Sequence, residues 1–275
     1  MDISLWSILL FILSVILYFS YPEYGKPAYT VGQSYEAYHA STMKPMALFL
    51  AVVIFTQLIL NTAYVSSKCG GGAALGKNIG LAVLYTVVPW LLIFGVVMLV
   101  LSMYPGFKKA FADVIGYYAV AGKANTLFSE MLRGSDIKNA IDGVSDPTEK
   151  GKLTKAAEAI MKICGNRSVL LNQMTAENFE SVWGKLTPLL TVEGAKAAKK
   201  QELLDLVVRR ENIGEAMWYV YTAILISSVV YYNLAAAGCV QDAASMKASH
   251  DKYLTQQEEA KAKTDLENQT QYTMS

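Results

Sequence analysis

The stretch Tyr104–Tyr117, with the sequence YPGFKKAFADVIGY, decides the architecture because a long apolar run ends there and a charged segment begins. Proline lacks a backbone N–H and glycine relaxes the chain, so Pro105 and Gly106 end one helix and turn the chain. Lys108 and Lys109 follow directly, as charges do where a spanning helix leaves the bilayer. The stretch therefore predicts a membrane–water boundary, with mostly apolar chain before it and mostly soluble chain after it.

Three segments of the chain resemble those of a known protein family. The first is Tyr104–Tyr117, whose pattern of aromatic-Pro-Gly-aromatic-Lys, then Phe, then Gly-Tyr is similar to membrane proteins of nucleocytoplasmic large DNA viruses, algal viruses included. The others are Leu171–Phe179 (LNQMTAENF) and Ile213–Tyr219 (IGEAMWY), which runs on to YYN at 231–233. The chain departs from the pattern at Phe107, where the pattern has Trp, and at 112–114, where it has a Ser-Asn-Thr-like run.

The resemblance implies a function and a location. Such a protein is expected to be a structural virion protein, a membrane-anchored minor capsid component that links the internal lipid bilayer to the capsid shell. Its expected partners are the bilayer, major or minor capsid proteins, and further copies of itself. Its expected location is the internal membrane of the virion, derived from the host endoplasmic reticulum, as a multi-pass protein.

Composition places the chain among membrane proteins. Hydrophobic residues make up 53% and charged residues only 17%, where soluble proteins have about 25% charged. The charge is segregated, because 16 of the 24 Lys and Arg residues lie between Tyr104 and Glu215. A net charge of +1 provides no basic surplus for nucleic-acid binding, so no nucleic-acid partner is expected.

The apolar runs predict four transmembrane helices in an all-α integral membrane protein. The runs are Ile3–Tyr21, Met46–Val65, Ile79–Met103 and Met217–Ala237, each long enough to span about 30 Å of hydrocarbon. The first has neither a basic leader nor a small-residue cleavage site, so we expect a retained anchor. Pro89 is expected to kink the third run.

These runs divide the chain into four parts. Residues 1–103 hold three transmembrane helices with their loops, 104–215 form a small soluble helical segment, 216–238 hold the fourth span, and 239–275 form a polar C-terminal tail. The tail is expected to be a solvated helix or disordered.

The soluble segment reads as helical throughout. Asp146 and Pro147 are an N-cap and a first helical residue for a helix that ends at Gly165. Thr175 is expected to begin a second helix, which stops before Pro188. A basic helix follows from about residue 192 and is expected to continue into the fourth span.

Two amides in the second span allow two interpretations. Gln57 and Asn61 are four residues apart and share one helical face. Buried amides are costly in lipid without partners, so this face is expected to form interhelical polar contacts. Together with the kink at Pro89, the same amides motivate the alternative function, a small membrane channel, transporter or membrane-remodelling factor.

Topology makes two of the three cysteines informative. Four spans place both termini and the turn 66–78 on one side of the bilayer. The other side carries more flanking Lys and Arg, so the soluble segment is expected to be cytosolic at insertion. Cys69 and Cys239 follow span ends on the opposite, lumenal side, where disulfides form. They are candidates for a disulfide between spans two and four. The alternative is three unpaired cysteines, Cys164 included.

Aromatic residues are the candidates for the core of the soluble segment or for its contacts with a partner. Five lie in the soluble segment and four in the Tyr-rich loop 22–44, whose tyrosines also suit the lipid headgroup level. They are Phe107, Phe111, Tyr117, Phe179 and Trp183 in the segment, and Tyr24, Tyr29, Tyr35 and Tyr38 in the loop.

The sequence offers no catalytic residues, cofactor-binding motif or metal ligands, so the protein is expected not to be an enzyme. His39 and His250 fall on opposite sides of the bilayer in the predicted topology and cannot act together. The segment 71–78 (GGAALGKN) has the spacing of a P-loop, but Asn78 stands where Ser or Thr would bind magnesium. It also lies between two spans, which leaves no room for a nucleotide-binding domain.

Overall fold

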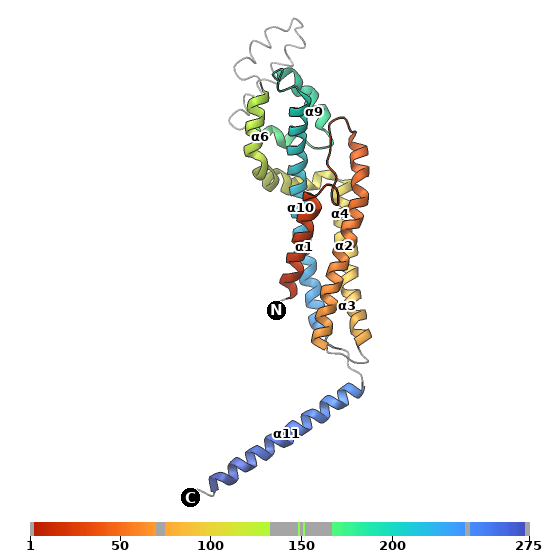
Figure 1. Ribbon diagram of the computed structural model, residues 1–275, viewed down its shortest axis with the longest axis vertical. Coiled ribbons are helices and arrows are strands. Elements are labelled where there is room, and N and C mark those ends of the chain that lie inside the picture. Colours follow the sequence, from red (N-terminus) through yellow and green to blue (C-terminus); the bar gives the residue numbers. More distant parts are fainter. Residues whose placement is uncertain are drawn as a thin grey trace.

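The computed structural model describes residues 3–69, 75–132, 148, 151, 167–239 and 243–272. Over these residues the protein is all-α, and the single extended pairing among them is a bridge between Leu132 and Leu190. Three parts follow one another along the long axis in Figure 1: a head, an apolar helical bundle and a separate C-terminal helix. Apart from residues 148 and 151, the helix expected from Asp146 to Gly165, with Cys164 in it, lies outside the described residues.

Four helical segments lie side by side in the apolar bundle (Figure 1). They are α1 (Ile3–Ser20), α2 (Tyr35–Cys69), the run α3–η1–α4 (Leu75–Pro89, Trp90–Phe94 and Gly95–Met103), and the C-terminal half of α10 (Ala197–Ala236). Three helices are long and apolar enough to cross a membrane, namely Tyr35–Cys69, Asn78–Met103 and Ala197–Ala236. The N-terminal helix is apolar but shorter. The chain is thus all-α with membrane-like helices.

Aromatic rings fill the centre of the bundle. Phe11 packs against Trp90 and Phe94, with ring centroids 5.4 Å apart in each pair. Tyr219 of α10 adds a fourth ring, 5.3 Å from Phe94. All four side chains are buried, so the removal of their apolar surface from solvent holds the helices together. The apolar side chains that the bundle leaves exposed include Leu9, Leu13, Phe55, Leu92 and Leu225.

The third apolar run changes its winding at Pro89. This residue ends α3, and the π-helical turn Trp90–Phe94 follows. The Gly95 N–H donates to the Trp90 carbonyl, five residues back, which is the wider hydrogen bond of a π-helix. Because proline cannot donate a backbone hydrogen bond, an irregularity at this position is expected.

The head has a hydrophobic core of its own. It is built from α6 (Tyr117–Met131), η4 (Arg167–Gln173), α9 (Phe179–Leu186), η5 (Thr187–Leu189) and the N-terminal half of α10. Phe128, Phe179, Leu203 and Val207 are buried in this core. Because α10 contributes to both cores without a break, the head and the bundle share one continuous helix (Figure 1).

The start of α9 differs from the sequence expectation. The helix begins at Phe179 and not at Thr175. The Thr175 N–H donates to Asn178 Oδ1 at 2.7 Å, and the Asn178 N–H donates to Thr175 Oγ1 at 3.1 Å. These reciprocal side-chain bonds replace the first helical turn. The helix ends at Leu186, before Pro188, as expected.

A short boundary segment joins the bundle to the head. It comprises η2 (Pro105–Lys108), α5 (Lys109–Phe111) and η3 (Ala112–Gly116), and it runs across the long axis in Figure 1. It crosses α10 closely, because a Cβ atom on Gly214 would lie 2.7 Å from the Lys108 carbonyl oxygen. A Cβ on Gly116 would similarly overlap the Arg210 backbone. Both glycines are needed for this approach.

The C-terminal tail contains one long helix, α11 (Ala243–Tyr272). The side chains described along it are exposed. It leaves the bundle at the end opposite the head (Figure 1).

Candidate functional site

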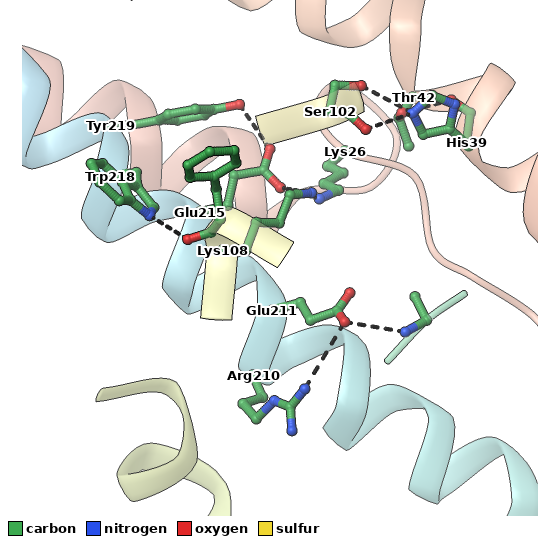
Figure 2. Close-up of polar contacts among 12 residues, drawn as sticks. Lys26, His39, Thr42, Ser102, Lys108, Arg210, Glu211, Glu215, Trp218 and Tyr219 are labelled. Atoms are coloured by element: carbon green, nitrogen blue, oxygen red, sulfur yellow. Dashed lines mark hydrogen bonds and ion pairs between the residues drawn. The ribbon is translucent and has the colours of Figure 1, made fainter. Parts of the chain in front are cut away.

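A buried carboxylate joins three segments where the bundle meets the head. Glu215 of α10 accepts hydrogen bonds from Lys26 Nζ and Lys108 Nζ, each 2.7 Å away. The Tyr219 hydroxyl donates to its second oxygen, also at 2.7 Å. Figure 2 shows these side chains converging on Glu215 from the α1–α2 loop, the boundary segment and α10. We call Lys26, Lys108, Glu215 and Tyr219 the junction cluster.

The local backbone explains why Lys26 reaches this position. The Lys26 N–H donates to the Tyr18 carbonyl at 2.8 Å, so the loop folds back over the end of α1. A Cβ atom on Gly25 would overlap the Tyr18 backbone, and only glycine fits there. The Lys26 ammonium also lies 5.5 Å from the centroid of the Phe19 ring, within cation–π range.

The electrostatics of Glu215 are dominated by its two lysines. Burial by itself raises the pKa of a carboxyl group, but the charges of Lys108 and Lys26 outweigh it here. The pKa of Glu215 therefore lies well below its usual value, and the group stays ionised at neutral pH. Two ammonium groups share one carboxylate, so the junction cluster keeps a positive charge.

Arg210 lies one turn earlier on α10 and binds the head. Its side chain is 0% exposed, and its guanidinium donates to the carbonyls of Leu171 and Met174, the latter at 2.7 Å. Asp113 of the boundary segment lies 3.8 Å from Nη1. Burial lowers the pKa of Arg210, and the neighbouring Glu211 and Asp113 oppose that shift. Arg210 thus ties η4 and the boundary segment to α10.

The pKa of Glu211 is raised, whereas that of Glu215 is lowered. It accepts a hydrogen bond from the Ala176 N–H at 3.2 Å, and Arg210 Nη2 lies 4.0 Å from the same oxygen (Figure 2). Burial raises the pKa of Glu211, and the nearby cations Lys108 and Arg210 compensate only in part. Of two glutamates one helical turn apart, only Glu215 has lysines in contact to stabilise its charge.

The three segments that carry the viral resemblance meet in this region. Lys108 and Asp113 come from Tyr104–Tyr117, and the carbonyls that bind Arg210 come from Leu171–Phe179. The indole N–H of Trp218 in the third segment donates to the Phe107 carbonyl at 2.9 Å. Segments far apart in the sequence therefore make one contact region between bundle and head.

The space directly beside Glu215 is small. A cavity of about 30 Å³ adjoins Glu215, with His39 in its wall. His39 Nε2 lies 3.0 Å from Ser102 Oγ and 3.2 Å from the Ser102 carbonyl oxygen (Figure 2). In the part of the chain that the structure describes, no group of three or more His, Cys, Asp and Glu side chains is placed to hold a metal ion.

The predicted cysteine pair lies at the other end of the bundle. Cys69 and Cys239 form a disulfide, with Cα atoms 5.3 Å apart. Cys69 ends α2, and Cys239 follows α10 by three residues. The bond therefore joins the ends of the second and fourth predicted spans.

The two amides of the second predicted span contact neighbouring helices. Gln57 accepts a hydrogen bond from the Ser7 hydroxyl and donates to the Ser7 carbonyl at 3.1 Å. Asn61 donates to Thr86 Oγ1 at 3.0 Å. The cavity beside them has a volume of only about 10 Å³. The amides thus join α2 to α1 and to α3.

The nine aromatic residues predicted as core or partner-contact residues separate into buried and accessible groups. The buried ones belong to the core and are not available as partner contacts. Tyr29, Tyr38, Phe179 and Trp183 are buried in the head core, where the two tyrosines stack with centroids 4.5 Å apart. They cannot contact a partner without unfolding the core. Tyr35, Phe111 and Tyr117 are half-buried, and Phe111 packs on Trp218. Only Tyr24, 81% exposed, and Phe107, 55% exposed, are open.

Sequence reasoning missed the junction cluster. In the sequence, Lys26, Lys108 and Arg210 count only as charges that flank the membrane, and Glu215 only as the end of the soluble segment. A signal was present, since Glu215 directly precedes an apolar run and is four residues from Tyr219, on the same helical face. An ionisable group at the start of a span needs a partner, and Lys26 and Lys108 flank the same boundary.

Comparisons with known proteins identify no relative. No protein-family model, curated protein or solved structure matches this chain.

Proposed function

We propose that the protein is a structural virion component, a membrane-anchored minor capsid protein that links an internal lipid bilayer to the capsid shell. The observation that carries the proposal is the junction cluster, in which the buried Glu215 fixes the loop, the boundary segment and α10 to one another. A protein that holds a capsid shell at a fixed position relative to a bilayer needs a stiff connection between its membrane part and its head. The resemblance of three segments to viral membrane proteins supports the same function.

We also propose that all four apolar segments span the bilayer. The helix α1 has 18 residues, which at about 1.5 Å per residue corresponds to roughly 27 Å, near the thickness of the hydrocarbon layer. Its outward side chains include Leu5, Leu9, Leu13 and Ile16, all exposed in the isolated chain. Lipid would cover this surface, whereas water would make it an aggregation site.

The head is the part proposed to meet the capsid. It projects beyond the apolar bundle along the long axis, while α11 extends from the opposite end (Figure 1). In a four-span topology these two parts lie on opposite sides of the bilayer. A capsid protein on the head side therefore reaches the head and not α11.

Crosslinking mass spectrometry on gradient-purified virus particles tests this proposal. A lysine-reactive reagent should join the exposed head residues Lys185 and Lys196 to a capsid protein. The matched internal control is Lys252 and Lys261 of α11, equally exposed, which should form no such links. Absence of the chain from the particles, or capsid links from α11 alone, would contradict the proposal.

The alternative, a small channel, transporter or membrane-remodelling factor, has weaker support. The amides that motivated it, Gln57 and Asn61, have hydrogen-bond partners on neighbouring helices. The cavity of about 10 Å³ beside them is smaller than a solute path requires. Solute flux through liposomes that contain the purified chain, abolished by Gln57→Leu, would favour the alternative.

A further inference from the structure

A groove runs between α1 and α10 where the apolar bundle meets the head. Its volume is about 620 Å³, within the range of ligand-binding pockets. Val15, Ile16 and Phe19 of α1 form one wall, and Ile213 and Ala216 of α10 form the facing wall. These five side chains are apolar, and Ile16 is exposed in the isolated chain. This half of the groove suits a hydrocarbon chain.

The polarity of the groove changes along α10. The polar residues of α10 that line it are Asp205, Arg209 and Asn212, with the apolar Val208 among them, and the lining ends with Ile213 and Ala216. The lining positions span 12 residues of the helix, or about 16 Å of length. The polar end lies toward the head and the apolar end toward the bundle. A phospholipid in a bilayer has the same order, with its polar headgroup at the water side and its acyl chains in the apolar layer.

The polar end contains groups that lack partners within the chain. Among the described residues no carboxylate lies within 4 Å of the Arg209 guanidinium, and Asp205 instead accepts a hydrogen bond from Gln201 at 2.7 Å. The buried Oδ1 atom of Asn212 has no hydrogen-bond donor among the described residues. Lys26, which lines the groove as well, belongs to the junction cluster with its surplus positive charge. The groove thus offers a cation to a ligand at its polar end.

We propose that this groove binds one anionic phospholipid. The phosphate lies at Arg209, and an acyl chain lies along Val15, Ile16 and Ile213. The charge and the polarity gradient favour an anionic lipid over an apolar peptide, which would leave the Arg209 guanidinium without an anionic partner. The inference rests on the proposed membrane insertion and adds a specific lipid to it.

Native mass spectrometry tests the proposal with the full chain in detergent. The delipidated protein is mixed with equal amounts of phosphatidylinositol, which has a negative charge and hydroxyl groups, and phosphatidylcholine. We expect a complex with one phosphatidylinositol, preferred by about tenfold, the size of effect that a charge-assisted hydrogen bond produces. Arg209→Gln should remove most of this preference. Lys109→Gln is the matched control, since Lys109 is an exposed cation of the boundary segment outside the groove.

A second variant tests the apolar half of the groove. Ala216→Trp fills the space for the acyl chain and should reduce binding of both lipids. Circular dichroism of each variant confirms that it remains helical. Equal binding of the two lipids, an equal loss in Lys109→Gln, or a lipid-free dimer would overturn the proposal, and the dimer would identify a second copy as the occupant. If alkaline carbonate releases the chain from membranes, the proposed function fails as well; if it stays integral without lipid preference, only the groove proposal fails.

Discussion

The two ends of the apolar bundle are held together by different chemistry. At the head end, Glu215 connects the segments through ionic hydrogen bonds to Lys26 and Lys108. At the far end, the disulfide between Cys69 and Cys239 connects α2 to α10. The predicted topology places the first end on the reducing, cytosolic side at insertion and the second on the oxidising, lumenal side. Each fastening therefore suits the compartment in which it is expected to form.

The disulfide and the junction cluster also differ in how many segments they hold in place. The disulfide restricts the unfolded chain over a separation of 170 residues but acts at one point. The junction cluster positions three segments at once, so its loss should loosen the head relative to the bundle.

Removal of the central carboxylate should have the largest effect. Glu215→Ala leaves two buried ammonium groups unpaired, so we expect a loss of about 3–5 kcal/mol in the free energy of unfolding. Thermal unfolding of the purified protein in detergent, followed by tryptophan fluorescence, measures it. The control is Glu180→Ala, which breaks the surface ion pair with Lys200 and should cost less than about 1 kcal/mol. Equal effects in both variants would refute the role of the junction cluster.

The junction cluster also predicts a pH dependence. Because the lysines hold the pKa of Glu215 below its usual value of about 4.3, its stabilising contribution is fully present above that pH. It is lost as the pH falls through the lower pKa of the folded protein. We therefore expect this contribution to stay constant from neutral pH to about pH 5 and to decline in stronger acid. A Glu215→Gln variant should lack that acid-dependent loss when the two unfolding profiles are compared.

Opening of the disulfide should have the next largest effect. Reduction, or Cys239→Ser, should lower the free energy of unfolding by about 2–4 kcal/mol. Unfolding with and without dithiothreitol measures the change. The reductant should have no effect on Cys239→Ser, and a mass shift on alkylation should report two additional thiols in the reduced wild-type chain. If both thiols are free in the unreduced protein, the disulfide account is wrong.

The close helix crossing predicts a smaller effect. Gly214→Ala places a Cβ 2.7 Å from the Lys108 carbonyl oxygen, so the backbone must shift, and we expect a loss of about 1–3 kcal/mol. Gly184→Ala is the matched control on α9, where nothing lies within 4 Å. Glycine to alanine in an open helical position should stabilise by about 0.4–1 kcal/mol. A urea titration of each variant measures the change, and effects of the same sign would contradict the close crossing.

The smallest predicted effect has the opposite sign. Burial raises the pKa of Glu211, so its charge destabilises the folded protein once the pH exceeds that raised value. Glu211→Gln removes the charge and keeps an oxygen for the Ala176 N–H. We expect a gain of up to about 1 kcal/mol at neutral pH, measured by thermal unfolding. A loss as large as that of Glu215→Ala would show that Glu211 also belongs to the ionic connection.

The sequence predicts the helical elements better than the contacts between them. Apolar runs and the Pro-Gly pair at 105–106 are local signals, and they place the three long membrane-like helices and the boundary. The continuity of α10 across that boundary also follows from its uninterrupted helical pattern. The burial of Arg210 and Glu215 does not, because the carbonyl of Met174 that binds Arg210 is 36 residues away along the chain and Lys26, which binds Glu215, is 189 residues away. The core position of Tyr29 and Tyr38 could not be predicted either. Tyrosines between two apolar runs suit a lipid interface as well as a protein core.

Alkaline carbonate extraction of membranes that contain the full chain tests the central claim most directly. High pH removes proteins bound by charge and leaves those whose helices cross the hydrocarbon layer. We expect the chain to remain in the membrane pellet, both in its native form and after reduction of the disulfide. Release of the native chain into the supernatant would contradict the account, because the exposed apolar side chains of α1, α2 and α10 would then need another cover than lipid.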